Sequence, residues 1–402
     1  ITMARRNGGF IGTDGLDAPD PPTGVTVSEG NTSASVAFTA PTDTGTSAIT
    51  GFVVQVSTDD TDYSVGSNTG TSSPIVVSSL TNGTAATAKV WAINAYGTSA
   101  PSAASASFTP ALNRGVFGNN QNSISRITYI GISTLGNAAD FGDRTVAYSN
   151  AGCCSSETRG VLGGGEDDPG GTMYNTMDYI TIATTGNATD FGDLTVARSD
   201  LTAGANSTRG VWIAGGKDGG TEYNTMDYVT IASTGNATDF GDYYVTLVKT
   251  TACTSTTRLL SFGGRDGGSL VNAINYITIG SAGNTTDFGD TSATMGYGAA
   301  VSSGTRAVVA FGRRASIGSN NNTMEYVTIA STGNSADFGD LTGTSSAINA
   351  TCSTTRGVFE GDFNLDYITI ASTGDAADFG NILGYNGNMS NGIMSSSHGG
   401  LS

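Results

Sequence analysis

The chain offers few side chains that could carry out chemistry. Among its 402 residues there is a single histidine, His398, near the C-terminus. A serine–histidine–aspartate triad, a histidine-ligated zinc ion and a histidine general base would all depend on that one residue. His398 also stands where an arginine recurs elsewhere in the chain. This alignment predicts a turn residue rather than a catalytic group.

The phrase Asp-Phe-Gly could hold a metal ion in a phosphoryl-transfer enzyme. Here it occurs six times, without the Gly-rich loop or catalytic-loop motif of such an enzyme. Its aspartates are separated by 48 to 50 residues, apart from a last step of 41: Asp140, Asp190, Asp239, Asp287, Asp337 and Asp378. A period of about 40–50 residues indicates an array of repeated supersecondary units. The phrase is therefore expected to be scaffold, at the entry to a turn and strand of each repeat.

Arginines recur with the same period and could suggest the arginine cluster of a sialidase-type site. They are Arg159, Arg209, Arg258, Arg306 and Arg356. Each follows a threonine in a turn of its own repeat. We therefore expect a contact within each repeat, for instance with the Asp-Phe-Gly-Asp turn, in place of a converging cluster.

Acidic loops are the remaining candidates for metal binding. They include Glu166–Asp168, Asp218 and Asp266, together with Asp59–Asp62 near the N-terminus. Calcium prefers several converging oxygen ligands, but no EF-hand or RTX spacing is present. We expect solvated turns, with no metal and no cofactor.

Composition limits the classes of partner. Lys and Arg total 17 against 34 Asp and Glu, for a net charge of −17. A nucleic-acid-binding protein usually carries a basic patch, so neither nucleic acid nor an anionic membrane surface is an expected partner. No apolar run reaches the roughly 20 residues that span a bilayer, and Ile1–Phe10 lacks the apolar segment of a signal peptide.

Four cysteines occupy equivalent places in different repeats, four to six residues before the recurring arginine: Cys153, Cys154, Cys253 and Cys352. If the repeats radiate from an axis, these places are too far apart for disulfides. Adjacent Cys153 and Cys154 are a poor pair as well. Buried free thiols are expected.

Two parts precede the repeats. Residues 1–17 are Gly-rich and predict an extended arm, whereas residues 18–110 predict a β-sandwich. The predicted strands are Val25–Val27, Ala34–Phe38, Gly51–Ser57, Ile75–Val77, Thr87–Ala95 and Ala103–Phe108. The segment resembles a fibronectin type III domain: Pro21–Val25 matches its first strand and Val90–Gly97 its sixth. Ala86 stands where the family has its corner tyrosine. Such domains are mostly spacers or binding modules.

Residues 111–402 hold the repeats, most fully as Ser207–Asp242. Three strands and a Thr-Gly-Asn turn are legible, and a small-residue strand such as Leu201–Ala205 precedes each Thr-Arg pair. Four strands per repeat, at a period of about 49 residues, predict a β-propeller. The Gly215–Gly216 pair, the tyrosine strand and Arg198 resemble kelch repeats, although several copies lack the glycine pair or the arginine.

Closure of the predicted ring involves both ends of the repeat region. Asn113–Phe117 begins with the second strand of a repeat, and Met389–Ser396 has the pattern of an innermost strand with no followers. Pairing them would complete a sixth blade and remove open sheet edges. The expected fold is all-β: a fibronectin type III-like sandwich followed by a six-bladed kelch-like propeller closed by the C-terminal strand.

Loops between the second and third strands differ in every repeat, unlike the near-identical turns at the other end. Loops on a rigid scaffold commonly carry binding residues. The candidate contacts are Asp168, Tyr174, Asp218, Tyr223, Arg265 and Arg313. The alternative, loop residues without a binding role, remains open.

The combination of near-identical blades, a fibronectin-like module and no visible export signal resembles structural proteins of tailed-bacteriophage virions, especially tail fibres or appendages. The resemblance implies a non-enzymatic protein on the tail or capsid surface. Residues Ala4–Leu16 would dock to other virion proteins, and the propeller would attach to a host surface glycan or receptor, with homo-oligomers on the particle. A capsid decoration or head-fibre protein and a bacterial surface adhesion protein are the alternatives.

Overall fold

The computed structural model describes residues 17–30, 32–82, 84–110, 113–118, 125–167, 171–217, 220–314, 321–345, 347–361, 364–382 and 394–401. Strands, turns and bends account for all regular structure in these residues, which contain no helix and therefore no helix that could span a membrane. The chain divides into two compact units, residues 1–113 and 114–402. The predicted arm, apart from Asp17, lies outside the described residues.

The N-terminal unit consists of two antiparallel sheets. One has the order β1-β2-β5 and the other β4-β3-β6-β7. Their bounds are β1 Thr23–Gly30, β2 Ser33–Thr39, β3 Ile49–Ser57, β4 Gly66–Gly70, β5 Ile75–Ser78, β6 Thr87–Asn94 and β7 Gly97–Thr98. Alternate residues of β2 and β6 are buried, among them Val36 and Val90. This two-residue period is the reason that the sequence pattern locates most of these strands.

The predicted strand Ala103–Phe108 is wrong. Serines spaced three residues apart dock this segment onto β6 instead. The hydroxyl groups of Ser99, Ser102 and Ser105 accept hydrogen bonds of 2.9–3.0 Å from the backbone of β6, while their own N–H groups donate back to it. A three-residue period is foreign to a β-strand, in which neighbouring side chains alternate. Only Phe108 forms a β-bridge, to Ala86.

The described residues of the second unit form six repeat sheets, numbered here in chain order. The first has the strand order β10-β9-β8-β33, and the next two have the orders β11-β12-β13-β14 and β15-β16-β17-β18. The fourth is β19-β20-β22-β23-β26 with β21 beside β22, the fifth β24-β25-β27-β28, and the sixth β29-β30-β31-β32. Within each sheet the strands are antiparallel, as the four-strand repeat pattern predicts.

The strands of the first three repeat sheets are short. Their bounds are β8 Arg114–Phe117, β9 Arg126–Gly131, β10 Ala139–Asp143, β33 Met394–Ser395, β11 Gly152–Ser155, β12 Arg159–Gly163, β13 Thr176–Thr181, β14 Thr189–Asp193, β15 Thr202–Ala205, β16 Arg209–Ile213, β17 Thr225–Thr230 and β18 Thr238–Asp242.

In the fourth and fifth sheets the third and fourth strands extend further into the connections, whereas the strands of the sixth sheet are again short. The bounds of the strands in these three sheets are β19 Thr251–Thr254, β20 Arg258–Phe262, β21 Arg265–Asp266, β22 Ser269–Thr278, β23 Thr286–Gly296, β24 Ala299–Ser302, β25 Arg306–Ala310, β26 Arg313–Arg314, β27 Asn321–Thr328, β28 Ala336–Ser345, β29 Asn349–Cys352, β30 Arg356–Glu360, β31 Asn364–Thr369 and β32 Ala377–Asn381.

Asp-Phe-Gly lies within the fourth strand of each sheet, where it forms a β-bulge. In the second sheet Asp190 and Gly192 pair with Asp178 and Met177, so Phe191 has no partner across the strands. The extra residue turns the Phe191 ring into the interior, where it is 2% exposed and meets Tyr179 edge-on at 6.1 Å. Since a bulge re-aims one side chain, the repeated phrase places one aromatic ring in each core.

Successive sheets pack face to face through apolar side chains. Trp212 of the third sheet is fully buried and donates a 3.1 Å hydrogen bond from Nε1 to the carbonyl of Gly152 in the second. A Cβ atom on Gly152 or Gly163 would overlap the indole ring. The two glycines therefore make room for the large side chain. All four cysteines are buried free thiols, as predicted.

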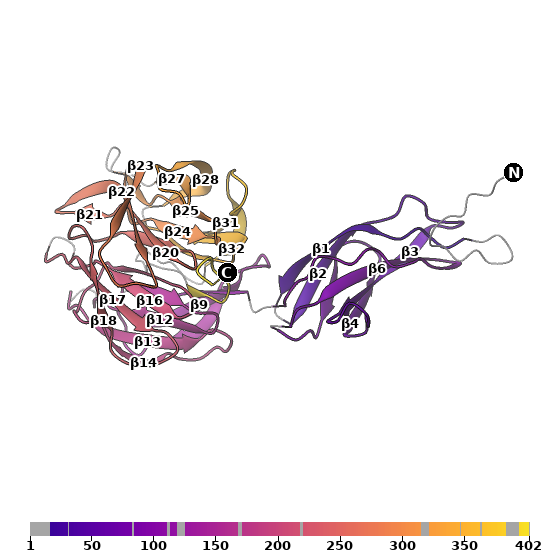
Figure 1. The fold of residues 1–402 in the computed structure, drawn as a ribbon, viewed down its shortest axis with the longest axis horizontal. Helices are drawn as coiled ribbons and strands as arrows, with labels where there is room; N and C mark the ends of the chain where they lie inside the picture. Colours follow the sequence, from indigo (N-terminus) through magenta and orange to yellow (C-terminus); the bar gives the residue numbers. More distant parts are fainter. Residues whose placement is uncertain are drawn as a thin grey trace. The chain divides into compact units, whose positions relative to one another are not determined.

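The two ends of the repeat region meet. β33 pairs with β8 through Met394–Val116 and Ser395–Gly115, as the strand count predicts, although residues 389–393 of the expected strand lie outside the described residues. The first strands of successive sheets, β11, β15, β19, β24 and β29, contact one another in that order, and β29 also contacts β8 and β33. Figure 1 shows β9 and β32, from opposite ends of the repeat region, on the same side of this unit.

Candidate binding surface

The Asp-Phe-Gly segment of each sheet is joined to the Thr-Gly-Asn-type turn of the next. In the second and third sheets, Gly235 donates its N–H to the Phe191 carbonyl at 2.7 Å. The Asn236 side chain accepts from the N–H of Asp193 at 3.1 Å. The same pair of bonds recurs at all six junctions, with an Asp375 side chain in place of asparagine at one. The last junction connects Asn381 to Asn137, and thus the sixth sheet to the first.

The recurring arginines form a second joint, and the expected Arg–Asp contact within each repeat is wrong. Arg209 lies over the ring of Tyr228 in its own sheet, 4.4 Å from the ring centroid, and donates from Nη1 to the Ile279 carbonyl of the next sheet at 2.9 Å. Tyr228 lies on the adjacent third strand and is partly buried, whereas Asp239 of the Asp-Phe-Gly segment is exposed. The equivalents are Arg114, Arg159, Arg258, Arg306 and Arg356.

The C-terminal segment, residues 394–401, contacts the first strand or the strand end of every repeat sheet. Beyond its pairing with β8, Ser395 donates its hydroxyl to the Cys352 carbonyl, and Gly399 donates its N–H to Ser302 at 3.1 Å. A Cβ atom on Gly400 would overlap the Ala205 carbonyl and the Thr254 hydroxyl. One short segment thus touches β11, β15, β19, β24 and β29 at or beside their last residues.

His398 holds this segment in place. Its ring is 1% exposed, with Nε2 2.9 Å from the Ser155 carbonyl, while Nδ1 accepts from the Gly400 N–H at 3.1 Å. These partners require the proton on Nε2. Burial lowers the pKa of His398 to about 4, against the opposing effect of the Ser155 hydrogen bond. The prediction that His398 replaces the repeated arginine in a turn understates its role, because both ring nitrogens are used to fix the chain end.

A third joint lies at the opposite end of the sheets from the recurring arginines. This end is called here the loop face, because the variable loops between the second and third strands lie there. Each third strand carries a buried residue just before its tyrosine: Thr128, Asp178, Asp227, Asn275, Glu325 or Asp366. The segment that follows the preceding Asp-Phe-Gly-Asp bonds to most of them. Thr145 and Arg144 bond to Asp178, and Thr195 and Arg198 bond to Asp227.

Buried ion pairs therefore lie beneath the loop face. Arg198 Nη1 is 2.7 Å from Asp227 Oδ2, and Arg144 Nε is 3.3 Å from Asp178 Oδ2, with all four side chains fully buried. Lys249 pairs with Asp200 nearby. Burial lowers the pKa of Arg198, although Asp227 opposes that shift. In the sequence, a polar residue stands just before each repeated tyrosine. That signal could have identified the buried Asp178 and Asp227.

The predicted contact residues occupy the loop face but do not form a single cluster. Tyr174 stacks on Tyr148, with ring centroids 5.2 Å apart, and the exposed Arg313 lies 4.6 Å above Tyr297. Tyr223 and Arg265 are partly buried and lie in separate loops. Asp168 and Asp218 lie outside the described residues. Neighbouring loops do touch, because Lys217 donates to the Gly171 carbonyl and Glu222 accepts from Gly267.

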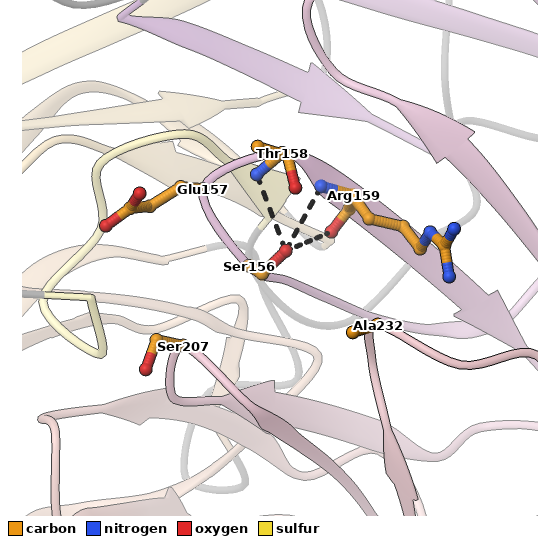
Figure 2. Close-up of a pocket in the computed structure, with 6 residues that line it drawn as sticks. All are labelled: Ser156, Glu157, Thr158, Arg159, Ser207 and Ala232. Carbon is orange, nitrogen blue, oxygen red and sulfur yellow. Dashed lines mark hydrogen bonds between the residues drawn. The ribbon is translucent and has the colours of Figure 1, made fainter. Parts of the chain in front are cut away.

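A pocket of about 330 Å³ lies at the opposite end of the sheets, between the second and third. Its walls are Ser156–Arg159, Ser207 and Ala232. Figure 2 shows Glu157 and Arg159 pointing to opposite sides of a turn that the Ser156 hydroxyl holds together. Ser156 bonds within this turn and Arg159 bonds to the Ile231 carbonyl, so these two side chains are committed to structure.

Of the acidic loops, the one at Asp59–Asp62 is a turn, whereas Asp266 lies in β21 and Glu166 forms β-bridges to Ser149 and Met173. Asp59 accepts hydrogen bonds of 2.8–2.9 Å from Ser57, Thr61 and Asp62. These bonds lower its pKa, with the Asp62 N–H as the largest contributor. Among the described residues, no three His, Cys, Asp or Glu side chains come together as a metal site. Asp59 thus organises its own loop.

Comparison with known proteins identifies the first unit. Residues 20–108 match the fibronectin type III domain, so the N-terminal sandwich is such a domain. No curated protein matches the chain.

Proposed function

We propose that the six repeat sheets form a closed, six-bladed β-propeller of kelch-like type. Two series of joints support this reading, because each leads from one sheet to the next and returns from the sixth to the first. Asn381 with Asn137 and Arg356 with Ile132 are the returning contacts. The pairing of β33 with β8 supplies the first sheet with its innermost strand. A closed ring leaves no first-strand edge open to another chain.

On this scaffold, the protein serves as a non-enzymatic structural protein of a tailed-bacteriophage virion, as a tail fibre or appendage that attaches to a host surface glycan or receptor. This proposal rests on one observation, the difference in role between repeated and variable residues. The repeated Asp-Phe-Gly, Asn and Arg residues are committed to joints, whereas the loop face varies from sheet to sheet. Variable loops on a rigid support are suited to recognition.

Several contacts favour recognition over catalysis. The sole histidine is buried with both nitrogens bonded to the backbone, so it is not placed to act as a base. The recurring arginines are spread one per sheet along the joints instead of converging on a substrate. The fibronectin type III domain at residues 20–108 is a spacer in this proposal. Residues Ala4–Leu16 would dock to other virion proteins, and copies of the chain would assemble as homo-oligomers on the particle.

Glycan-array binding by the purified chain tests the attachment role. We expect binding without hydrolysis, weakened by Tyr223→Ala or Arg313→Ala on the loop face. Glu157→Gln, at the opposite end of the sheets, is the matched control and should bind like the parent chain. Equal loss in all three variants, or release of cleaved sugar, would contradict the proposal.

Localisation on purified particles by cryo-electron microscopy separates the remaining alternatives. Density on the tail supports a fibre or appendage. Density on the head, without glycan binding, would favour a capsid decoration or head-fibre protein. Detection on a bacterial surface would favour an adhesion protein instead.

A further inference from the structure

A cavity lies between the fifth and sixth repeat sheets, where four other repeats carry a larger side chain. It measures about 300 Å³ and lies at the loop face, between the end of β28 and the start of β31. Gly343 and Ser345 form one side, and Phe359, Asn364 and Asp366 form the other. Small-molecule sites have volumes of about 300–1,000 Å³. The cavity is therefore large enough for one side chain or a small ligand.

Comparison among the repeats explains the cavity. Five residues beyond the second aspartate of Asp-Phe-Gly-Asp, four repeats carry a large buried side chain: Tyr148, Arg198, Leu247 or Met295. The fifth copy has Ser345 in that place. Two residues earlier, Gly343 replaces the valine or alanine of these four copies, and a Cβ atom there would meet nothing within 4 Å. Two small residues thus leave the space open.

A buried carboxylate faces this space. Asp366 is 6% exposed and corresponds to Asp178 and Asp227, each of which has an arginine partner. Within the described part of the chain, Asp366 accepts hydrogen bonds from Thr342, through the N–H at 2.9 Å and the hydroxyl at 2.7 and 2.8 Å. Among the described residues, no lysine or arginine forms an ion pair with it. Burial raises the pKa of Asp366, and the Thr342 bonds oppose that shift.

The same chain shows which group complements such a carboxylate. Arg198 occupies the position equivalent to Ser345, and its guanidinium group reaches Asp227 at 2.7 Å. We propose that the cavity beside Asp366 binds a guanidinium group, either of a small molecule or of an arginine side chain on a partner protein. A guanidinium group presents a planar fork of donors that suits a carboxylate. A divalent cation would want several carboxylates, whereas only Asp366 faces this cavity among the described residues.

This site does not depend on the virion proposal, and either can fail alone. The test is a titration of the full chain with millimolar N-methylguanidinium, followed by amide chemical shifts, with N-methylurea as the uncharged control. We expect saturable shifts near residues 341–345 and 364–366 with the cation alone. Equal shifts with N-methylurea, or no shifts with either compound, would overturn the proposal.

Three variants sharpen this test. Asp366→Asn should weaken binding at least tenfold, whereas Asp337→Asn, which removes an exposed carboxylate of β28, should leave it unchanged. Ser345→Met fills the cavity, as Met295 does in another sheet, and should abolish binding while keeping Asp366. Equal weakening by both aspartate variants, or full binding by Ser345→Met, would contradict the site. The methionine variant keeps the test decisive if Asp366→Asn does not fold.

Ser345→Arg supplies the missing partner from within the chain. We expect this variant to unfold at a higher temperature than Ser345→Met and to bind no N-methylguanidinium; unchanged binding would argue against the cavity.

A blocked peptide with one arginine, compared with its citrulline analogue, distinguishes the two sources of the ligand. Tighter binding of the arginine peptide than of N-methylguanidinium points to a partner protein, and the reverse order points to a small molecule. Equal binding of the arginine and citrulline peptides would contradict recognition of the charge.

Discussion

Asn187 accepts a 3.1 Å hydrogen bond from the backbone N–H of Asp143, and the two residues belong to different repeat sheets. The bond connects the turn of one repeat to the Asp-Phe-Gly-Asp segment of the repeat before it. Asp-Phe-Gly, the phrase that most resembles a catalytic motif, therefore forms one side of a contact between two sheets. The other side of this contact is the Thr-Gly-Asn-type turn, which explains why both phrases recur together.

At the equivalent joint between the second and third sheets, Gly192 should tolerate a side chain poorly. Gly192 has a φ of +141°, and a Cβ atom on it would overlap the Gly235 carbonyl across the joint. Gly235 also has a positive φ, +155°, but a Cβ there would meet nothing within 4 Å. Backbone strain of about 1–3 kcal/mol applies to alanine at either site, and overlap adds about 1–3 kcal/mol at Gly192 alone.

Chemical denaturation of Gly192→Ala and Gly235→Ala measures that difference. We expect Gly192→Ala to be the less stable of the two by at least about 1 kcal/mol. Equal losses would mean that the neighbouring turn moves aside and that the joint is not tightly packed.

The arginine joint should respond to loss of its guanidinium group. Arg209→Ala removes a charged hydrogen bond, worth about 1.5–3 kcal/mol, and a cation–π contact of about 0.5–1 kcal/mol. Arg209 is partly exposed, so we expect a total loss in free energy of unfolding of about 1–3 kcal/mol. Arg209→Lys keeps the charge near Tyr228 and should lose less. Arg126→Ala is the control, since that side chain is 45% exposed and 3.9 Å from Asp140; a loss as large as that of Arg209→Ala would contradict the joint.

Periodicity made the strands predictable, but the partners of the recurring side chains were not. The strand pattern of the repeats depends on burial alternating along each strand, which the sequence records directly. The partner of Arg209 is a backbone carbonyl at Ile279, 70 residues away, and a carbonyl group has no residue type to detect. For that reason the sequence predicts an aspartate partner for Arg209, and that prediction is wrong.

Two departures from the strand and repeat patterns could not be predicted from the sequence, for a related reason. Ser99, Ser102 and Ser105 follow a three-residue period that a search for alternation treats as an ordinary strand. The cavity beside Asp366 depends on Ser345 and Gly343, whose small size matters only when the repeats are placed in register. Tyr174 lies between β12 and β13, but the sequence did not predict its stacking on Tyr148.

Removal of the C-terminal segment should destabilise the whole repeat unit. A chain that ends at Ile393 lacks β33, the fully buried Met394 and the buried His398. Burial of a methionine alone is worth about 2–5 kcal/mol, and the edge of β8 would be left unpaired. We expect a lower unfolding temperature, measured by calorimetry, with partial recovery when a peptide of residues 394–402 is added. An unchanged unfolding temperature would be incompatible with closure by this segment.

Acid should weaken the repeat unit through His398. Its pKa is about 4 in the folded chain, against 6.5 for an unperturbed histidine, so the unfolded chain takes up the proton first as the pH falls. The stabilisation is complete above pH 6.5 and is lost between pH 6.5 and 4, by a total of about 3 kcal/mol. Protonation of Nδ1 would also remove the acceptor for the Gly400 N–H. Denaturation between pH 4.5 and 7.5 measures this slope, and His398→Gln, which does not titrate, should flatten it; the same slope in both proteins would assign the acid sensitivity to carboxylates instead.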